Sequence, residues 1–589
     1  MSDLRIEEEF AQKSLDRKTL SKLLAFLKPY RKPYAVVLIL EILWVALILA
    51  GPIVVQKTID NYIPNKNLKL LVAACSIYAS FYFFRWIIEI AQIRMNIRSG
   101  KSFLNDLRKA IFSHLQKLSM NYYDRTKHGR IIARADRDVD QLEYPFVWGP
   151  VIILSSSLSL IMSSFIMAKY SLKLFGMTLL LIPIMAIATN IFRKKGMQAH
   201  RRVRESLSNI TANLAENISG VRVAQAFCRE KINCSRFRDI VNTHRNNVVH
   251  SSVVWNLYFP IIMILHGLSV TITIIYGGHL IGEGELTIGK MSAFIMYSGM
   301  FFGPILELSD LYNGMLSGAS AAERIFLLLD TEPSVQNRAD ARDADHLSGR
   351  VNFTNVNFKY KDDGPSILEN INFSIRPGET VALVGETGAG KTSIAGLLAR
   401  FYEATSGTVA IDDRPIDELK MESLHAHMGI VLQENFLFSG SVLENLRFGR
   451  PEATNEEIYE TAMQLGTHEI FSALSDGYNT IIKEQGKGLS LGERQLICFT
   501  RAFVADPRIL ILDEATSAVD SKTEKILQSA LEKLLKNRTS LVIAHRLSTI
   551  KSANRILVLE KGRVVEEGSH EELISKKGSY YSMYEEYIA

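Results

Sequence analysis

The chain has few cysteines and a small net charge, and both features exclude classes of protein. Its four cysteines are Cys75, Cys228, Cys234 and Cys498, and they show neither a C-x-x-C pair nor the spacing of a paired-histidine zinc site. A disulfide framework and a zinc site are therefore not expected. The formal net charge of +6 is too small to indicate a nucleic-acid-binding protein.

The N-terminal segment also lacks the pattern of a targeting signal. Residues 1–18 are polar and partly acidic, unlike a secretory signal or a transit peptide. In residues 19–28, leucines recur at i, i+3, i+4 and i+7 beside lysines, before Pro29 breaks the helix. This pattern predicts an amphipathic helix on the inner face of a membrane, with a short core helix as the alternative.

The two halves of the chain differ in composition. With 589 residues, 47% of them hydrophobic, the chain is too long for one core. The first half holds long apolar runs near the ~20 residues that cross a bilayer, whereas the second alternates short strands and helices. Six spans are predicted, at residues 34–57, 69–93, 146–168, 172–192, 253–280 and 288–315. The third and fourth should form a tight hairpin.

Lysine and arginine are concentrated in two of the segments that join these spans. Residues 94–137 and 193–238 are rich in both, while the loops on the opposite side are short and nearly free of them. By the positive-inside rule, both termini are cytoplasmic. The basic segments keep a helical period, so spans two to five should extend into the cytoplasm and turn back near 121–129 and 217–220. Such turns are suited to contact a cytoplasmic domain; solvated loops are the alternative.

A glycine-rich stretch in the second half fits the phosphate-binding pattern G-x-x-x-x-G-K-[ST]. Its residues are Gly385, Glu386, Thr387, Gly388, Ala389, Gly390, Lys391 and Thr392, followed by Ser393. A strand is expected before it and a helix after it, so that glycines wrap the phosphates, Lys391 supplies positive charge and Thr392 ligates Mg²⁺. A chance glycine-rich turn is the alternative, and the full match between a strand and a helix disfavours it.

Two carboxylates follow an apolar strand about 120 residues after this loop. The run from Arg508 ends in Asp513 and Glu514, which is the form expected of a Walker B element. Asp513 would hold Mg²⁺ through water, and Glu514 would act as general base on the attacking water. The alternative is that the two acids only cap the next helix.

The segment Leu489–Gln495 resembles the L-S-G-G-Q signature of ATP-binding cassette (ABC) proteins. The order phosphate loop, Gln433, signature, Asp513-Glu514, Ser517–Asp520 and His545 is also that family's order. With six spans on the same chain, the sequence is similar to an ABC exporter half-transporter of the lipid A flippase and multidrug type. The resemblance covers essentially the whole chain.

The resemblance implies further roles, residue by residue. Tyr360 would stack on adenine, and His545 would contact the γ-phosphate. Gln433 would sense the γ-phosphate, ligate Mg²⁺ and connect to the membrane helices. Ser490 and Gly492 would close over ATP held by the phosphate loop of a second subunit. These roles rest on the resemblance, whereas those of Lys391, Thr392, Asp513 and Glu514 also follow from their own chemistry.

The signature departs from the family pattern at two positions. Leu491 replaces a glycine and Glu493 replaces a glutamine. A carboxylate adds like charge near a triphosphate, and a leucine restricts the approach of the backbone. In the family, heterodimeric members have one consensus and one degenerate site. The chain is therefore expected to form a heterodimer, with a homodimer as the alternative.

Ionisable residues inside the predicted spans are costly and indicate function or pairing. They are Glu41, Arg85, Glu89, His266, Glu307 and Asp310. Arg85 and Glu89 could pair at i and i+4. An acidic cavity would favour cationic amphiphiles. The sequence does not distinguish between drugs, lipids and peptides as the substrate.

Together these patterns predict a multi-domain protein with a six-helix transmembrane domain followed by an α/β P-loop nucleotide-binding domain. The boundaries are 1–33 for the N-terminus and interfacial helix, 34–330 for the membrane domain, 331–349 for a linker and 350–589 for the nucleotide-binding domain. The expected activity is ATP- and Mg²⁺-dependent export of amphiphilic substrates by alternating access in the inner (plasma) membrane, with a second half-transporter as partner and no nucleic acid. An ATP-gated regulatory or channel-like protein, or an importer, is the alternative.

Overall fold

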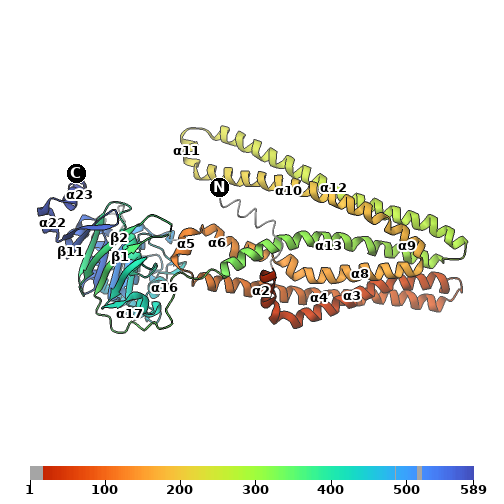
Figure 1. The fold of residues 1–589 in the computed structure, drawn as a ribbon, viewed down its shortest axis with the longest axis horizontal. Helices are drawn as coiled ribbons and strands as arrows, with labels where there is room; N and C mark the ends of the chain where they lie inside the picture. The colour runs from red at the N-terminus through yellow and green to blue at the C-terminus, as the bar shows by residue number, and fades with distance from the viewer. Residues whose placement is uncertain (1–16, 362, 484–485, 514–520, 545, 589) are drawn as a thin grey trace. The chain divides into compact units, whose positions relative to one another are not determined.

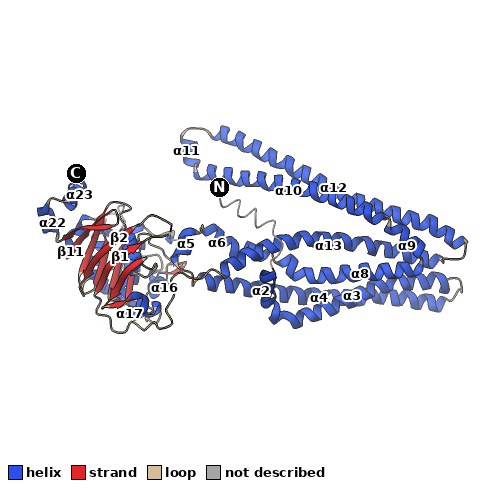
Figure 2. Cartoon of the chain, viewed as in Figure 1, coloured by secondary structure: helices blue, strands red, loops and turns tan. Residues whose placement is uncertain are grey.

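The chain forms two compact units in the computed structural model, which describes residues 17–361, 363–483, 486–513, 521–544 and 546–588. Unit 1 comprises the chain up to Leu115 and Gly129–Asp330, and unit 2 comprises Gln116–His128 and the chain from Thr331 onward. In the described chain, unit 1 is helical and the strands lie in unit 2 (Figure 2).

The helices of unit 1 are joined by short turns (Figure 1). They are α2 (Arg17–Leu27), η1 (Lys28–Tyr30), α3 (Arg31–Lys57), η2 (Thr58–Tyr62), α4 (Leu68–Leu115), α6 (His128–Ala135), α7 (Arg137–Asp140), η3 (Glu143–Trp148), α8 (Gly149–Tyr170), α9 (Leu172–Leu179), α10 (Leu181–Ser219), α11 (Val221–Ala226), α12 (Glu230–Gly282) and α13 (Ile288–Leu329). Among the described residues, 6 helical stretches are long and apolar enough to cross a membrane. The six predicted spans are thereby confirmed.

Four spans continue far beyond a bilayer, three of them as their helical period predicts. Helix α4 has 48 residues, α10 has 39, α12 has 53 and α13 has 42. At about 1.5 Å per residue, each is much longer than the roughly 30 Å of a hydrocarbon core. The third span differs, because its extension is divided into α6, α7 and η3, with Pro145 in η3 and Pro150 at the start of α8.

The predicted hairpin between the third and fourth spans is present. Helix α8 ends at Tyr170 and α9 begins at Leu172. The Ser171 side chain between them accepts a hydrogen bond of 3.3 Å from the Leu174 N–H and so caps α9. Helices α10 and α12 then run side by side, joined by a 2.9 Å hydrogen bond between Ser206 and His244 (Figure 1).

Unit 2 contains a six-stranded sheet in the order β12-β11-β3-β10-β9-β6. Its strands are β3 (Thr380–Gly385), β6 (Met428–Val431), β9 (Ile509–Asp513), β10 (Thr539–Ile543), β11 (Arg555–Glu560) and β12 (Arg563–Gly568). All neighbours are parallel except β12, which runs antiparallel to β11. The five residues of β10 are all buried, as expected for a central parallel strand.

Two smaller sheets and a set of helices complete unit 2. The four-stranded antiparallel sheet has the order β2-β1-β4-β5, and β7 pairs with β8. These strands are β1 (Val351–Phe358), β2 (Leu368–Ile375), β4 (Ser406–Ile411), β5 (Arg414–Pro415), β7 (Gly440–Ser441) and β8 (Ile481–Ile482). The helices are α5 (Met120–Arg125), α14 (Lys391–Leu398), η4 (Ile416–Glu418), α15 (Met421–Ala426), α16 (Val442–Arg447), α17 (Asn455–Leu465), α18 (His468–Ser472), η5 (Gly477–Asn479), α19 (Leu491–Val504), α20 (Ser521–Leu535), α21 (Leu547–Ser552), α22 (His570–Lys576) and α23 (Ser579–Ile588).

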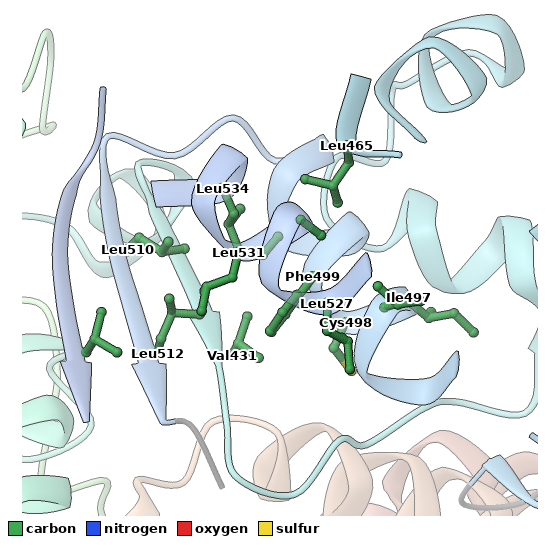
Figure 3. Close-up of a cluster of buried hydrophobic side chains, with 14 of the residues drawn as sticks. Val431, Leu465, Ile497, Cys498, Phe499, Leu510, Leu512, Leu527, Leu531 and Leu534 are labelled. Carbon is green, nitrogen blue, oxygen red and sulfur yellow. The ribbon is translucent and has the colours of Figure 1, made fainter. Parts of the chain in front are cut away.

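Two hydrophobic clusters hold unit 2 together. In one, Leu510 and Leu512 of β9 face Phe499 of α19 and Leu531 of α20 (Figure 3). In the other, side chains of the two larger sheets pack against α14. The second cluster fixes the start of α14 relative to the end of β3, which is where the phosphate loop lies.

Candidate functional site

The strands that carry the expected site residues end at one edge of the six-stranded sheet. Residue Ile543 of β10 is aligned with Leu383 of β3 on one side and with Asp513 of β9 on the other. On the far side of β9, Val431 of β6 is aligned with Leu512. The loops that follow β3, β6, β9 and β10 therefore leave from a common edge, where parallel α/β sheets bind ligands.

The loop Gly385–Thr392 joins β3 directly to α14, as its sequence predicts. Gly388 and Gly390 have left-handed backbone angles, with φ of 87° and 107°. A Cβ atom at Gly390 would lie 2.6 Å from the Leu368 side chain, whereas a Cβ at Gly388 would meet nothing within 4 Å. Packing against Leu368 therefore requires glycine at position 390, whereas the space beside Gly388 is free of other protein atoms.

Lys391 bridges the two ends of this loop. Its ammonium group donates hydrogen bonds of 2.6 Å to the Gly385 carbonyl and 2.9 Å to the Glu386 carbonyl. The residue is 8% exposed. Burial lowers the pKa of Lys391, and the nearby Asp513 carboxylate acts in the opposite direction. A buried ammonium group within the phosphate loop is suited to hold a phosphate group.

The first turn of α14 presents the groups expected to contact a nucleotide. Thr392 is exposed and Ser393 is buried. The Ser393 hydroxyl shares a 2.9 Å hydrogen bond with the hydroxyl of Tyr360. The Tyr360 ring packs edge-on against Phe358 and Tyr402, at 4.8 and 5.2 Å between ring centroids. Tyr360, whose role is expected from family resemblance alone, is thus hydrogen-bonded to the helix that follows the phosphate loop.

Gln433 and Asp513 line one small cavity. Both sequence-predicted residues border it, together with Gln495 of α19 and apolar side chains of β6 and β9. Gln495 is 5% exposed and was not predicted as a site residue, although its place next to the signature pointed to it. Glu514 and His545, and Ser517–Asp520 with them, lie outside the residues that the structure describes.

The signature residues begin α19 and form a reciprocal cap. The Ser490 hydroxyl accepts the Glu493 N–H at 3.2 Å, and the Glu493 carboxylate accepts the Ser490 N–H at 2.7 Å. Gly492 is buried, and Leu489 packs against the hydrophobic core. The Glu493 carboxylate is therefore directed to the backbone of its own helix, as in a capping box. This contact was not predicted, although the spacing S-x-x-E indicates it.

Unit 2 also contains the turn within the first basic segment. The Arg125 guanidinium donates a 2.5 Å hydrogen bond to the Tyr360 carbonyl, and the Tyr402 hydroxyl donates a 2.7 Å bond to Asp124. The Ser119 hydroxyl accepts the Val335 N–H at 2.9 Å. This turn therefore contacts the unit that carries the phosphate loop, and the cytoplasmic location of that unit stays a prediction. Arg125 and Tyr402 were not singled out from the sequence, because neither belongs to a motif.

The donor set fits a magnesium nucleotide. Magnesium prefers hard oxygen ligands and usually takes only one or two from protein carboxylates. Thr392, Gln433 and Asp513 offer a hydroxyl, an amide and a carboxylate oxygen. The described residues contain no group of ≥ 3 His, Cys, Asp or Glu side chains that would indicate another metal.

Comparison with known proteins agrees with both units. Residues 34–305 match the family model "ABC transporter transmembrane region", and residues 368–517 match the model "ABC transporter". The Bacillus subtilis "Uncharacterized ABC transporter ATP-binding protein YknV" is 38% identical over 97% of this chain and 95% of its own. YgaD of the same organism, named "Putative multidrug export ATP-binding/permease protein", is 32% identical over 96% and 98%.

A solved structure shows the same architecture throughout. It is described as "Structure of a bacterial Atm1-family ABC exporter with ATP bound", with a TM-score of 0.79, 26% identity and coverage of 95% of this chain and 98% of that one. The membrane unit, the ATP-binding unit and their order in one chain are common to both. The chain belongs to the ABC transporter family and is a multi-pass, ATP-hydrolysing exporter.

Proposed function

We propose that the chain exports amphiphilic substrates by alternating access, with ATP closing two nucleotide-binding units and hydrolysis releasing them. One observation carries the proposal. The turn that continues the second membrane span is hydrogen-bonded to Tyr360, and Tyr360 is hydrogen-bonded to Ser393 on the phosphate-loop helix. A change at the nucleotide thus has a short covalent and hydrogen-bonded path to a membrane helix.

The proposed hydrolytic roles follow from the edge of the sheet. Lys391 and the first turn of α14 bind the phosphates, and Tyr360 stacks on the adenine. Thr392, Asp513 and Gln433 would hold Mg²⁺, which would neutralise charge on the phosphates. Glu514 follows Asp513 directly and takes the proton of the attacking water. His545 follows the end of β10 and contacts the γ-phosphate.

The second half of each site comes from a partner subunit. Ser490 and Gly492 lie at the N-terminus of α19, where the helix dipole favours an anion. Because Leu491 and Glu493 alter this surface, we propose a heterodimer in which this chain supplies Glu514 to the consensus site. Because the Glu493 carboxylate is hydrogen-bonded to the Ser490 N–H, we expect the signature to bind ATP more weakly than the consensus sequence but not to lose binding.

The proposed orientation places unit 2 and both termini in the cytoplasm of a cell with this protein in its inner (plasma) membrane. The lysine and arginine content of residues 94–137 and 193–238 supports it. The turn Gln116–His128 belongs to the first of these basic segments and clusters with the ATP-binding unit.

The variant Glu514→Gln tests the mechanism. The full-length chain, co-purified with its partner and reconstituted in vesicles, should still bind ATP but lose hydrolysis and substrate uptake by at least about 100-fold, the lower end of the range for one acid–base group. Glu532→Gln, on an exposed position of α20, is the control and should keep both activities. Unchanged transport by Glu514→Gln would refute export driven by hydrolysis and favour an ATP-gated pore.

A further inference from the structure

A large apolar cavity lies among helices α8, α10, α12 and α13 of unit 1. Its volume is about 880 Å³, within the roughly 300–1,000 Å³ of small-molecule sites. Residues from all four helices line it, among them Leu160, Ile182, Met185, Trp255, Ile305 and Tyr312. The cavity is therefore roomy enough for a substrate and mostly apolar.

One carboxylate enters this apolar lining. Among the described lining residues, Asp310 of α13 is the only Asp, Glu, Lys, Arg or His side chain. Its Oδ2 atom accepts a 3.0 Å hydrogen bond from the Tyr144 hydroxyl, and no lysine or arginine forms an ion pair with it among the described residues. Asp310 is exposed, and a carboxylate within a membrane-spanning stretch is costly unless it is paired. A cation in the cavity would complete its pairing.

The neighbouring carboxylate on the same helix is used differently. Glu307, one turn before Asp310, accepts a 2.7 Å hydrogen bond from Ser156 of α8 and does not line the cavity. The two acids thus have the same chemistry and different surroundings. Both accept a hydroxyl hydrogen bond from another element, but only Asp310 lines the cavity.

Aromatic rings border the same space as Asp310. Trp255 of α12 packs along α10, where a Cβ at Gly196 would lie 3.2 Å from its ring, and the His200 ring centroid is 5.5 Å away. Tyr312 and Phe192 also line the cavity. Faces of Trp and Tyr attract cations, most strongly where water is excluded.

We propose that this cavity binds aromatic monocations and that Asp310 selects their charge. The inference rests on the proposed export function and names the substrate class. The apolar wall contributes through the area that it removes from water, which is independent of charge. The discrimination between a cation and an anion of the same shape then comes from Asp310 and the rings. An anionic lipid or a peptide with an acidic side chain would be disfavoured.

The test uses two ions of closely similar shape and opposite charge. Tetraphenylphosphonium and tetraphenylborate are titrated against the full-length chain co-purified with its partner, in nanodiscs without ATP. Empty nanodiscs are the blank for lipid partitioning. The wild type should bind the phosphonium at least tenfold more tightly than the borate, and Asp310→Asn should remove this difference. Glu307→Gln, the matched control, should change the phosphonium affinity less than twofold.

A second variant guards against a folding defect. Trp255→Leu keeps Asp310. It should lower the affinity for both ions, and more for the phosphonium, without changing which ion binds more tightly. Equal affinity of the wild type for both ions, or an unchanged preference in a folded Asp310→Asn protein, would overturn the inference.

The experiments distinguish a failure of the proposed binding site from a failure of the proposed export function. If the phosphonium binds through Asp310 but ATP does not drive its movement across vesicles, the site stands and the export of this class fails. If ATP drives transport of neutral or anionic substrates while the phosphonium does not bind, the exporter stands and the charge selection is wrong.

Discussion

The hydroxyl of Ser490 and the carboxylate of Glu493 each accept the backbone N–H of the other residue. This reciprocal cap explains how a carboxylate can replace glutamine in the signature. Either side chain presents an oxygen to the Ser490 N–H at this spacing. The charge is also placed at the N-terminus of α19, where a helix favours an anion.

Replacement of Glu493 should separate capping from charge. Glu493→Gln keeps an acceptor and should change the stability of unit 2 by less than about 0.5 kcal/mol, whereas Glu493→Ala should lower it by about 1 kcal/mol. Unfolding of this unit can be followed through Cys498, which is its only cysteine and is buried. The background has Cys75, Cys228 and Cys234 replaced by serine, and the readout is the rate of thiol labelling in urea.

In the same proteins, the charge is tested by ATP turnover of the assembled transporter. Glu493→Gln should raise hydrolysis if the carboxylate weakens the site that it closes. Equal stability of the alanine and glutamine variants would show that the cap contributes nothing.

Asp412 offers a pH-dependent test of how the start of β1 is held. Burial alone would raise the pKa of Asp412, but hydrogen bonds from the Ser348 hydroxyl and from the N–H groups of Arg350, Gly349 and Ser348 outweigh it and lower the pKa. A depressed carboxylate pKa contributes stability above the unfolded value near 3.9, and this is lost as pH falls through the folded value. Asp412→Asn should therefore destabilise unit 2 by about 1 kcal/mol at pH 7, after allowance for solvent screening.

The difference between wild type and Asp412→Asn should shrink as the pH is lowered below about 4. The adjacent, exposed Asp413→Asn is the control, with a change below about 0.5 kcal/mol at either pH. The rate of Cys498 labelling measures the stability of unit 2, provided that it is divided by the labelling rate of the unfolded protein at the same pH. A destabilisation of Asp412→Asn that is constant with pH would mean that its charge is not involved.

Local patterns predicted the parts of this protein that depend on local physics. Six apolar runs gave the six spans, because crossing a bilayer fixes length and composition. The G-x-x-x-x-G-K-T run gave the strand, loop and helix around Lys391, because left-handed angles at Gly388 and Gly390 need glycine.

Contacts between distant segments could not be predicted in the same way. The bonds from Arg125 to Tyr360 and from Tyr402 to Asp124 join residues 235 and 278 positions apart. No periodicity in either segment encodes the other. The cavity at Asp310 is similar, because its walls come from four helices, and an acidic residue in one span does not show whether it pairs or stands free.

Lys391 should contribute to nucleotide binding and not to the stability of the nucleotide-free protein. Its pKa is lowered because burial disfavours the ammonium form. This penalty is fully present below the folded pKa and is relieved as the pH rises through it. Lys391→Met should therefore leave the urea midpoint of unit 2 unchanged or higher at pH 7, and the two proteins should converge near pH 10.

ATP should reveal what Lys391 contributes. At 100 times its dissociation constant, a ligand stabilises the wild type by about 2.7 kcal/mol, and Lys391→Met should lose most of this at the same ATP concentration. Lys361→Met, at an exposed position outside the loop, should keep it. A nucleotide-free Lys391→Met protein that is clearly less stable than the wild type would show that the two carbonyl bonds of Lys391 matter more than its desolvation.

The bond between Arg125 and Tyr360 should determine how tightly hydrolysis is coupled to transport. Arg125 reaches a main-chain carbonyl, so replacement of the guanidinium leaves the Tyr360 ring and its bond to Ser393 in place. Arg125→Ala in the assembled transporter should keep ATP binding and at least half of the basal hydrolysis, and lose roughly tenfold in substrate moved per ATP, the equivalent of about 1.4 kcal/mol.

Two further variants locate this effect in the contact itself. Tyr402→Phe removes the hydrogen bond to Asp124 and keeps the ring against Tyr360, so it should lower coupling by a smaller factor. Lys127→Ala removes an exposed cation of the same turn for which the structure shows no side-chain hydrogen bond or ion pair within the described chain, and it should transport normally. If Lys127→Ala uncouples as strongly as Arg125→Ala, the turn acts through its positive charge. If neither variant alters the ratio of transport to hydrolysis, the second span receives its signal by another route.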